Sequence, residues 1–207
     1  INDILDFSKI ESGKLSLEAI DFDLVELVED SVEMFAQPAA GKGLELASQL
    51  SPPNVALRMR GDAFRLRQVL ANLLSNAAKY TDEGGQIQLS IDDSEPPWVL
   101  LRVRDNGIGI SPEMVQSIFE LFTQATRSLD RAQGGLGIGL TLVRHLVGMH
   151  GGSVSVRSAG PGQGSEFVVR LPRLGSPPAA LHRSDPSATL PAPPRRVLVV
   201  DDNQDVA

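Results

Sequence analysis

Apolar residues recur every three or four positions in four parts of the chain, which predicts helices around 1–12, 24–35, 65–79 and 140–147. Elsewhere apolar residues form short runs or alternate with polar ones, which predicts strands near 44–50, 56–60, 86–91, 98–104, 153–157 and 166–171. The last two strands flank a glycine-rich turn and are expected to form a hairpin. Intermixed helices and strands predict a two-layer α+β sandwich, although the pattern leaves the strand order open.

Composition narrows the class of protein. The 207 residues are 42% hydrophobic, enough for one substantial core, and the apolar runs are too short to span a membrane. A net charge of −7 argues against a nucleic-acid partner. The chain has no cysteine, which permits a reducing compartment. We expect a cytoplasmic segment without membrane contact, and the start at Ile1 rather than Met indicates an excerpt of a longer protein whose upstream part supplies any anchor.

The predicted helix at 65–79 carries an unusual polar stripe, with Asp62 as its expected N-cap. Gln68, Asn72, Asn76 and Lys79 lie three or four residues apart and therefore share one side of the helix. Such stripes are most often solvated faces. Asparagine is a mediocre helix former, so two inside one helix favour a functional reason. Amide oxygens can join the coordination of Mg²⁺, and a lysine can neutralise phosphate charge.

Two glycine-rich segments follow. Residues 105–109 (Asp-Asn-Gly-Ile-Gly) end a strand, and Ser111-Pro112-Glu113 is typical of a helix start, so the order is strand, loop, helix. Residues 134–139 (Gly-Gly-Leu-Gly-Ile-Gly) lead into an apolar helix, whose N-terminus offers free amides to phosphate. A plain turn and a flexible connection are the alternatives. Neither segment fits the dinucleotide or P-loop pattern.

In this order, the helix and the two loops resemble the N, G1 and G2 boxes of the histidine kinase ATP-binding domain, which is a Bergerat-fold ATPase. The resemblance implies a mixed β-sheet with about three helices on one face, and an ATP lid expected at 123–133. It also implies ATP and Mg²⁺ as ligands. The implied activity is that of a protein-histidine kinase of a two-component phosphorelay, which transfers the ATP γ-phosphoryl group to a histidine and then by relay to an aspartate.

The resemblance also assigns roles to residues. The catalytic group would be Asn72, Asn76 and Lys79, with Asn76 as the Mg²⁺ ligand and Asn72 supporting the metal and phosphates. Asp105 would accept a hydrogen bond from the adenine amino group. The full set expected to contact ATP is Asn76, Lys79, Tyr80, Asp105, Gly107, Gly109, Arg131, Gly135, Gly137 and Gly139. Within it, Arg131 is a lid cation able to reach the γ-phosphate.

Four parts are expected along the chain. Residues 1–15 resemble the C-terminal end of a dimerisation hairpin, 20–172 the ATP-binding catalytic domain, 173–194 a Pro-rich linker, and 195–207 the first strand of a truncated response-regulator receiver domain. In a complete receiver domain, Asp201 and Asp202 would bind Mg²⁺. The implied partners are the hairpin that carries the phosphoacceptor histidine, in cis or in trans, a receiver domain or response regulator, and a second copy in a homodimer.

The acceptor histidine is expected to lie outside this chain. The histidines here are His145, His150 and His182, and none has the setting of the family's phosphoacceptor. One alternative is a hydrolysing Bergerat-fold ATPase, but such enzymes use glutamate where this chain has Asn72, because an amide cannot accept the proton of water. The other alternative is a degenerate nucleotide-binding regulatory module, and the intact boxes speak against it.

Overall fold

The computed structural model describes residues 2–50, 57–121, 123 and 137–173. Its helices are α1 (Asn2–Glu11), α2 (Leu24–Gly41), α3 (Ala63–Tyr80), α4 (Pro112–Ser117) and α5 (Gly139–Met149). Its strands are β1 (Ile20–Asp23), β2 (Glu45–Leu50), β3 (Arg58–Gly61), β4 (Gln86–Asp92), β5 (Trp98–Asp105), β6 (Ser153–Arg157) and β7 (Ser165–Pro172). None of the described helices is both long and apolar enough to cross a lipid bilayer.

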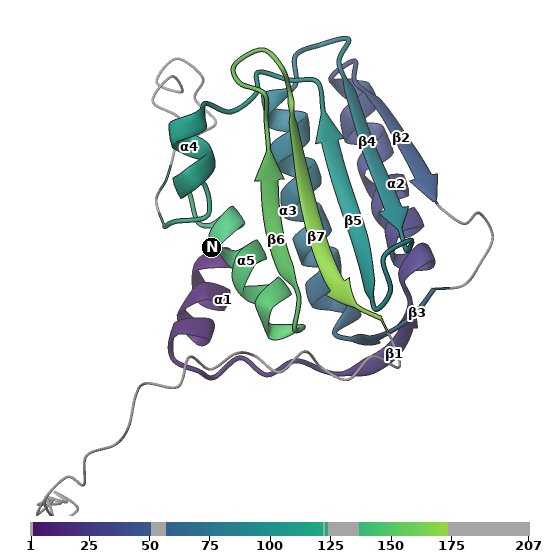
Figure 1. The fold of residues 1–207 in the computed structure, drawn as a ribbon, viewed down its shortest axis with the longest axis vertical. Helices are drawn as coiled ribbons and strands as arrows, with labels where there is room; N and C mark the ends of the chain where they lie inside the picture. Colours follow the sequence, from purple (N-terminus) through teal and green to yellow (C-terminus); the bar gives the residue numbers. More distant parts are fainter. Residues whose placement is uncertain (1, 51–56, 122, 124–136, 174–207) are drawn as a thin grey trace, which may run out of the picture.

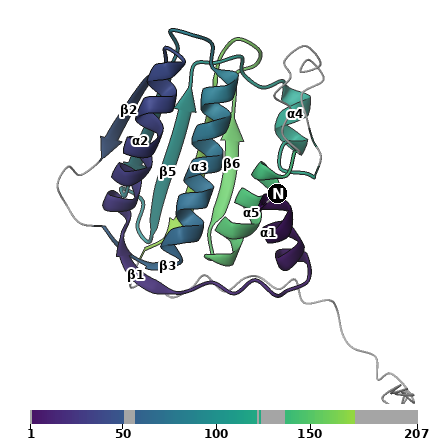
Figure 2. The ribbon, with the colours of Figure 1, turned by 180° about the vertical axis from the view of Figure 1, so that it is seen from behind.

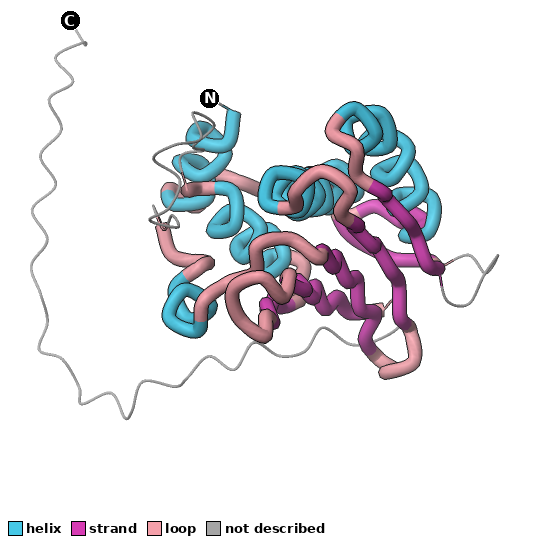
Figure 3. Tube along the Cα trace, turned by 90° about the horizontal axis from the view of Figure 1, so that it is seen from above, coloured by secondary structure: helices cyan, strands magenta, loops and turns pink. Residues whose placement is uncertain are grey.

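Five strands form one mixed sheet in the order β2-β4-β5-β7-β6 (Figure 1). The β2–β4 pair is parallel, whereas the other three pairs are antiparallel, including the predicted β6–β7 hairpin. Helices α2, α3 and α5 lie together on one face of the sheet (Figure 2). Viewed from above, the helical layer and the sheet are separate (Figure 3). The predicted two-layer α+β sandwich with three helices on one face is therefore confirmed.

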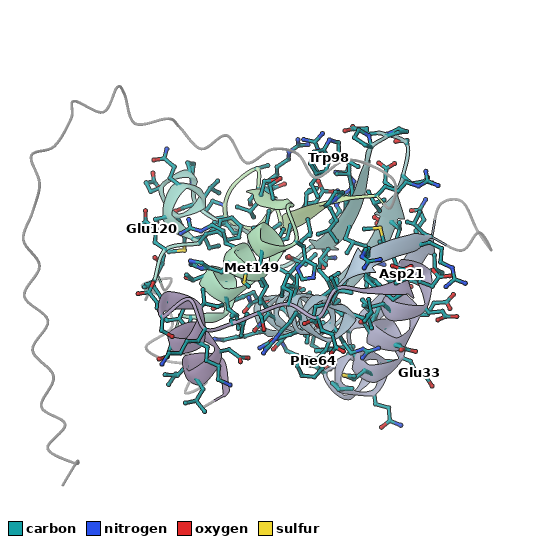
Figure 4. The ribbon with its side chains drawn as sticks, turned by 90° about the horizontal axis from the view of Figure 1, so that it is seen from below. Asp21, Glu33, Phe64, Trp98, Glu120 and Met149 are labelled. Carbon is teal, nitrogen blue, oxygen red and sulfur yellow. The ribbon has the colours of Figure 1, made fainter. Side chains whose placement is uncertain are left out.

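The core lies between the two layers. Helix α3 contributes six buried side chains spaced three or four residues apart, as its pattern predicted: Leu66, Val69, Leu70, Leu73, Leu74 and Ala77. Strand β4 buries Ile87, Leu89 and Ile91 from alternate positions. Full burial of one such leucine or isoleucine contributes about 1.5–3 kcal/mol. Figure 4 shows Trp98 on the sheet side and Phe64, which is 67% exposed, on the helical side.

The sequence pattern missed two features of the fold. Helix α2 continues to Gly41, beyond the predicted end near residue 35, although Pro38 lies inside it. Because proline is disfavoured within helices, its presence indicated that the helix ends before residue 38, and the last turn was not predicted. Strand β1 was not predicted, because its four residues are largely exposed and show no clear alternation. It pairs with β3 outside the main sheet, a contact between distant segments.

Helix α3 begins at the predicted cap and is tied there to α5. The Asp62 carboxylate accepts hydrogen bonds from the backbone amides of Arg65 (3.0 Å) and Glu18 (3.1 Å). The backbone amide of Asp62 in turn donates to Nε2 of His150 at 3.0 Å, while Nδ1 of His150 donates to the Leu146 carbonyl at 2.7 Å. Both ring nitrogens of this histidine are thus engaged in holding α5 against the start of α3.

Helix α1 packs beside α5, as Figures 1 and 2 both show. The Asp6 carboxylate accepts from Nη1 of Arg65 (2.8 Å) and Nε2 of Gln68 (2.9 Å), both on α3. The Phe7 ring meets the ring of His145 on α5 edge-on, with centroids 5.9 Å apart. Gln68, the first residue of the predicted polar stripe of α3, therefore binds α1. The next two residues of the stripe, Asn72 and Asn76, lie further along the helix and form a separate amide pair.

Docking of α1 is expected to weaken in acid. Burial alone raises the pKa of the Asp6 carboxyl, but hydrogen bonds from Gln68 and Arg65 and the Arg65 charge outweigh burial and hold the pKa below its ordinary value of 3.8. The ionised carboxylate therefore stabilises docking above about pH 4, and this contribution is lost as the pH falls below 3.8 through the folded pKa. Amide exchange in α1, measured by NMR from pH 6 to about pH 3, should accelerate relative to that in α3.

An Asp6→Asn variant is the control for this pH dependence. Its α1 amides should exchange faster already at pH 6, and their protection relative to α3 should no longer change with pH. An unchanged acid response in this variant would assign the effect to another group.

Several predicted parts lie outside the described residues. They are the lid at 123–133 apart from Thr123, the linker at 173–194 apart from Arg173, and the receiver strand at 195–207 with Asp201 and Asp202.

Candidate functional site

The three motifs predicted from the sequence meet around the C-terminal half of α3. The backbone amide of Ile108, in the loop after β5, donates to the Tyr80 carbonyl at the end of α3 (3.0 Å). On the same helix, Oδ1 of Asn72 lies 3.0 Å from the position that a Cβ on Gly139 would occupy, at the start of α5. The helix therefore contacts both glycine-rich loops, as a single site requires.

Asp105 lies at the end of β5 and is only 7% exposed. Its Oδ1 accepts from the Gly107 backbone amide at 2.9 Å, and its Oδ2 accepts from the Ser165 hydroxyl. These two hydrogen bonds orient the carboxylate, and each oxygen keeps further acceptor capacity. A fixed, buried acceptor of this kind can accept a hydrogen bond from an amine such as the exocyclic amino group of adenine, whereas guanine has a carbonyl at the equivalent position. The contact of Asp105 with adenine stays a prediction.

The glycines of the loop after β5 are explained by close backbone packing. A Cβ on Gly107 would collide with the Tyr80 carbonyl oxygen. Gly109 has φ of +69°, and a Cβ there would collide with the Gly160 carbonyl oxygen. Glycine at these positions lets the loop fit between α3 and the β6–β7 turn. Their predicted contact with a nucleotide stays a prediction.

The loop after β5 is also bonded to the β6–β7 turn, and the two lie side by side at the top of Figure 1. The Gly162 amide donates to the Ile108 carbonyl at 2.6 Å. The Ser158 hydroxyl accepts from the Ile110 amide at 3.0 Å and donates to the Gly164 carbonyl at 2.7 Å. The loop that positions Asp105 is thereby held on two sides.

Asn72 and Asn76 are the amide pair of α3, one helical turn apart and both partly buried. Neither side chain hydrogen bonds to another residue within the described part of the chain. A partly buried amide without a partner among these described residues is open to a ligand. Amide oxygens are hard donors of the type that Mg²⁺ accepts beside phosphate oxygens, so this pair fits the metal that the resemblance implies.

Lys79 and Tyr80 occupy the last turn of α3, one turn beyond Asn76. Nζ of Lys79 lies 5.0 Å from the centroid of the Tyr80 ring, over its face. A cation here is favoured by the negative end of the helix dipole. The two side chains form a cationic and aromatic pair on the same helix as the amide pair. Their contacts with phosphate and ribose stay a prediction.

The start of α5 has no side-chain cap. Its N-cap is Ile138, so no N-cap side chain accepts from the first-turn amides of α5, and the binding of phosphate there stays a prediction. Gly137 has φ of +70°, and Gly139 faces the Asn72 amide. Arg131 and Gly135 lie outside the described residues.

Sequence reasoning missed two polar residues at the site. Ser165 orients Asp105 from β7, which pairs with β5 so that Asp105 and Ser165 are opposite each other. Thr81, just after α3, is 1% exposed, and its hydroxyl has no hydrogen-bond partner among the described residues. Only the position of Thr81 beside Tyr80 could have drawn attention to it. Nothing in the sequence sets the strand register that brings Ser165 to Asp105.

Residues 61–175 match the family model for the histidine kinase-, DNA gyrase B- and HSP90-like ATPases, which is more than half of the chain. The chain belongs to this ATPase family. The Asp105 loop, the α3 amide pair and the α5 N-terminus all lie within the matched region.

Among members of this ATPase family, the chain is similar to sensor histidine kinases. It is 40% identical over 212 residues to sensor histidine kinase GacS of Pseudomonas protegens, covering 99% of this chain and 22% of that protein. It is 41% identical over 179 residues to signal transduction histidine-protein kinase BarA of Escherichia coli K12, covering 83% of this chain and 19% of that protein. The chain thus spans about a fifth of these curated relatives.

A solved structure gives the same likeness in three dimensions. Full-length ShkA in complex with AMPPNP superposes with a TM-score of 0.72 at 32% sequence identity, over 83% of this chain and 35% of that one. The catalytic domain of histidine kinase ThkA superposes with a TM-score of 0.65 at 27% sequence identity, over 75% of this chain and 96% of that one. The described fold is therefore that of a histidine kinase catalytic domain.

Proposed function

We propose that this chain is the ATP-binding catalytic part of a hybrid sensor histidine kinase, which transfers the γ-phosphoryl group of ATP to a histidine of a dimerisation hairpin. The observation that carries the proposal is that the loop after the buried, oriented Asp105 carboxylate contacts the end of α3, the helix that carries Asn72 and Asn76. The similarity to sensor histidine kinases supports it.

In this proposal each group has one task. Asp105 accepts from the adenine amino group, and Lys79 and Tyr80 contact phosphate or ribose. Asn76 holds Mg²⁺ with support from Asn72, and the metal, when bound, neutralises phosphate charge. The remaining phosphate contacts come from the second glycine-rich segment and the lid: Arg131, Gly135, Gly137 and Gly139. Gly107 and Gly109 shape the loop under the base.

The amide at Asn72 favours phosphoryl transfer over ATP hydrolysis. Asn72 lies against the start of α5, where a hydrolysing member of the fold would need a carboxylate to activate water. An amide cannot accept that proton. The chemistry of this position therefore excludes a general base and leaves positioning of phosphate and metal as its role.

We propose that the acceptor histidine lies outside this chain. His150 uses both ring nitrogens in holding α5, and His145 packs on Phe7 with Nδ1 at 2.9 Å from the Thr141 carbonyl. His182 lies outside the described residues. Residues 1–15, which contain helix α1, would be the C-terminal end of the hairpin that carries the acceptor.

The further partners follow from the proposed organisation. Residues 173–194 would link the catalytic domain to a receiver domain that begins at 195–207, with Asp201 and Asp202 as its Mg²⁺ ligands. A response regulator or this receiver would take the phosphoryl group onward. The whole protein would act as a homodimer with its catalytic part in the cytoplasm, where ATP is available.

Incubation with γ-labelled ATP and Mg²⁺ tests the proposal. The chain alone should remain unlabelled, whereas an added dimerisation hairpin of a sensor histidine kinase should acquire acid-labile, base-stable label. Transfer should be slow, because no tether raises the effective concentration of the acceptor. Label on His145, His150 or His182 would contradict the placement of the acceptor elsewhere. Release of free phosphate with an unlabelled hairpin would favour the hydrolysing class instead.

A further inference from the structure

Lys42, just after α2, is bonded to the ends of two helices. Its backbone amide caps α2 by donating to the carbonyls of Ala39 and Ala40. Its side chain crosses to the end of α3, where Nζ donates to the carbonyl oxygens of Ala78, Lys79 (3.3 Å) and Thr81 (2.7 Å). One ammonium group thus donates to two carbonyls of the last turn of α3 and to that of Thr81, the residue after it.

The carbonyls at the end of α3 can be accounted for one by one. A helix leaves its last carbonyls without partners inside the helix. Nζ of Lys42 takes those of Ala78, Lys79 and Thr81, and the Ile108 amide takes that of Tyr80. The carbonyls at the end of α3 therefore accept hydrogen bonds either from Lys42 or from the loop that positions Asp105.

The chemistry of lysine suits this position. An ammonium has three donors and no acceptor, which matches a set of converging carbonyls. Its positive charge lies at the negative end of the α3 dipole. The adjoining backbone is fixed as well, since the Gly84 amide donates to the Gly43 carbonyl and the Glu45 amide to the Gly85 carbonyl, both at 2.9 Å. The base of the Lys42 side chain is therefore held in place against the segment that follows α3.

We propose that Lys42 is a positioning residue for the nucleotide site. It holds the last turn of α3 where Lys79 and Tyr80 reach the ligand and where the Tyr80 carbonyl receives the Ile108 amide. This inference rests on the proposed function of the site in ATP binding. Lys42 acts through the backbone of α3, so its loss changes the geometry of the site without removing any of the groups assigned to ATP or Mg²⁺.

Three variants separate positioning from general stabilisation. Lys42→Met keeps roughly the length of the side chain but removes its N–H donors and its charge. Lys42→Arg keeps the donors and the charge. Arg67→Met is the matched control, because Arg67 also joins α3 to α2, through a 3.0 Å ion pair with Asp30 at an exposed place away from the end of α3. All three are compared with the unchanged chain at a temperature where circular dichroism shows each to be folded.

Two measurements are made on each variant. Calorimetric titration with AMPPNP and Mg²⁺ gives nucleotide affinity, and NMR amide exchange of Ile108 without nucleotide reports the contact with the Tyr80 carbonyl. Lys42→Met should weaken affinity roughly tenfold, as expected for one lost charge-assisted interaction, and should accelerate Ile108 exchange. Lys42→Arg should restore most of both, and Arg67→Met should change neither. If Lys42→Met does not fold, Lys42→Gln, which keeps two N–H donors but no charge, should weaken affinity several-fold.

The outcomes distinguish this proposal from the function on which it rests. If the unchanged chain binds no AMPPNP, the proposed function fails. If it binds and Lys42→Met binds equally well with unchanged Ile108 exchange, only the role of Lys42 is refuted. Equal losses of affinity in Lys42→Met and Arg67→Met would also refute it, because any loosening of α2 against α3 would then produce the effect.

Discussion

Replacement of Asn76 by alanine is expected to remove the magnesium-dependent part of ATP binding and to lower phosphoryl transfer to a supplied hairpin at least about a hundredfold. The Asn76 amide is partly buried on α3 and bonds to no other described residue, so it is available to a metal ion. Adenine contacts through Asp105 would remain. The variant should therefore still bind the nucleotide without magnesium, with an affinity close to that of the unchanged chain.

Folding does not confound this experiment. Alanine has a higher helix propensity than asparagine, and removing an amide that has no partner among the described residues leaves none of their polar groups unsatisfied. Calorimetric titration of AMPPNP with Mg²⁺ and with EDTA measures the magnesium-dependent part directly. Ser75→Ala is the control, because Ser75 is the exposed neighbour of Asn76 on the same helix. An Asn76→Ala protein that keeps the full gain in affinity from Mg²⁺ would show that the metal is held elsewhere.

Features set by local pattern were predictable from the sequence. The extent of α3, its cap at Asp62 and its buried stripe follow from the spacing of residues within one helix. The amide pair was found for the same reason, since asparagine is unfavourable inside a helix unless something else requires it. Gln68 lies on the same side but hydrogen bonds to Asp6 of α1. That contact depends on how α1 packs, which no spacing along α3 reveals.

Features set by pairing between distant segments were not predictable. Ser165 reaches Asp105 only because β7 pairs with β5 in one particular register. A shift of one residue would point Ser165 to the other face of the sheet, and the sequence pattern alone did not fix the order of the strands. Lys42 reaches the end of α3 through the packing of α2 against α3, and so it also escaped notice.

Asp105→Asn is expected to weaken ATP binding about tenfold or more, because a charge-assisted hydrogen bond is worth about 1.5–3 kcal/mol. The asparagine oxygen can still accept from the Gly107 amide, which keeps the turn. Its amide nitrogen, however, replaces the oxygen that accepts from Ser165 and turns an acceptor into a donor. The preference for ATP over GTP should fall with the affinity, since a donor at this position opposes the adenine amino group and suits the guanine carbonyl.

Ser165→Ala separates the charge of Asp105 from its orientation. This variant keeps the carboxylate and removes only the hydroxyl that bonds to Oδ2, so affinity for ATP should fall by several-fold, as for one ordinary hydrogen bond of about 1 kcal/mol. Its preference for ATP over GTP should persist, because the acceptor remains an acceptor. Calorimetric titrations of both variants with AMPPNP and its guanine counterpart, with Mg²⁺ present, provide the comparison. Equal affinity of the unchanged chain for the two nucleotides would contradict the assignment of Asp105 to adenine. Loss of selectivity in Ser165→Ala but not in Asp105→Asn would transfer that assignment to the hydroxyl.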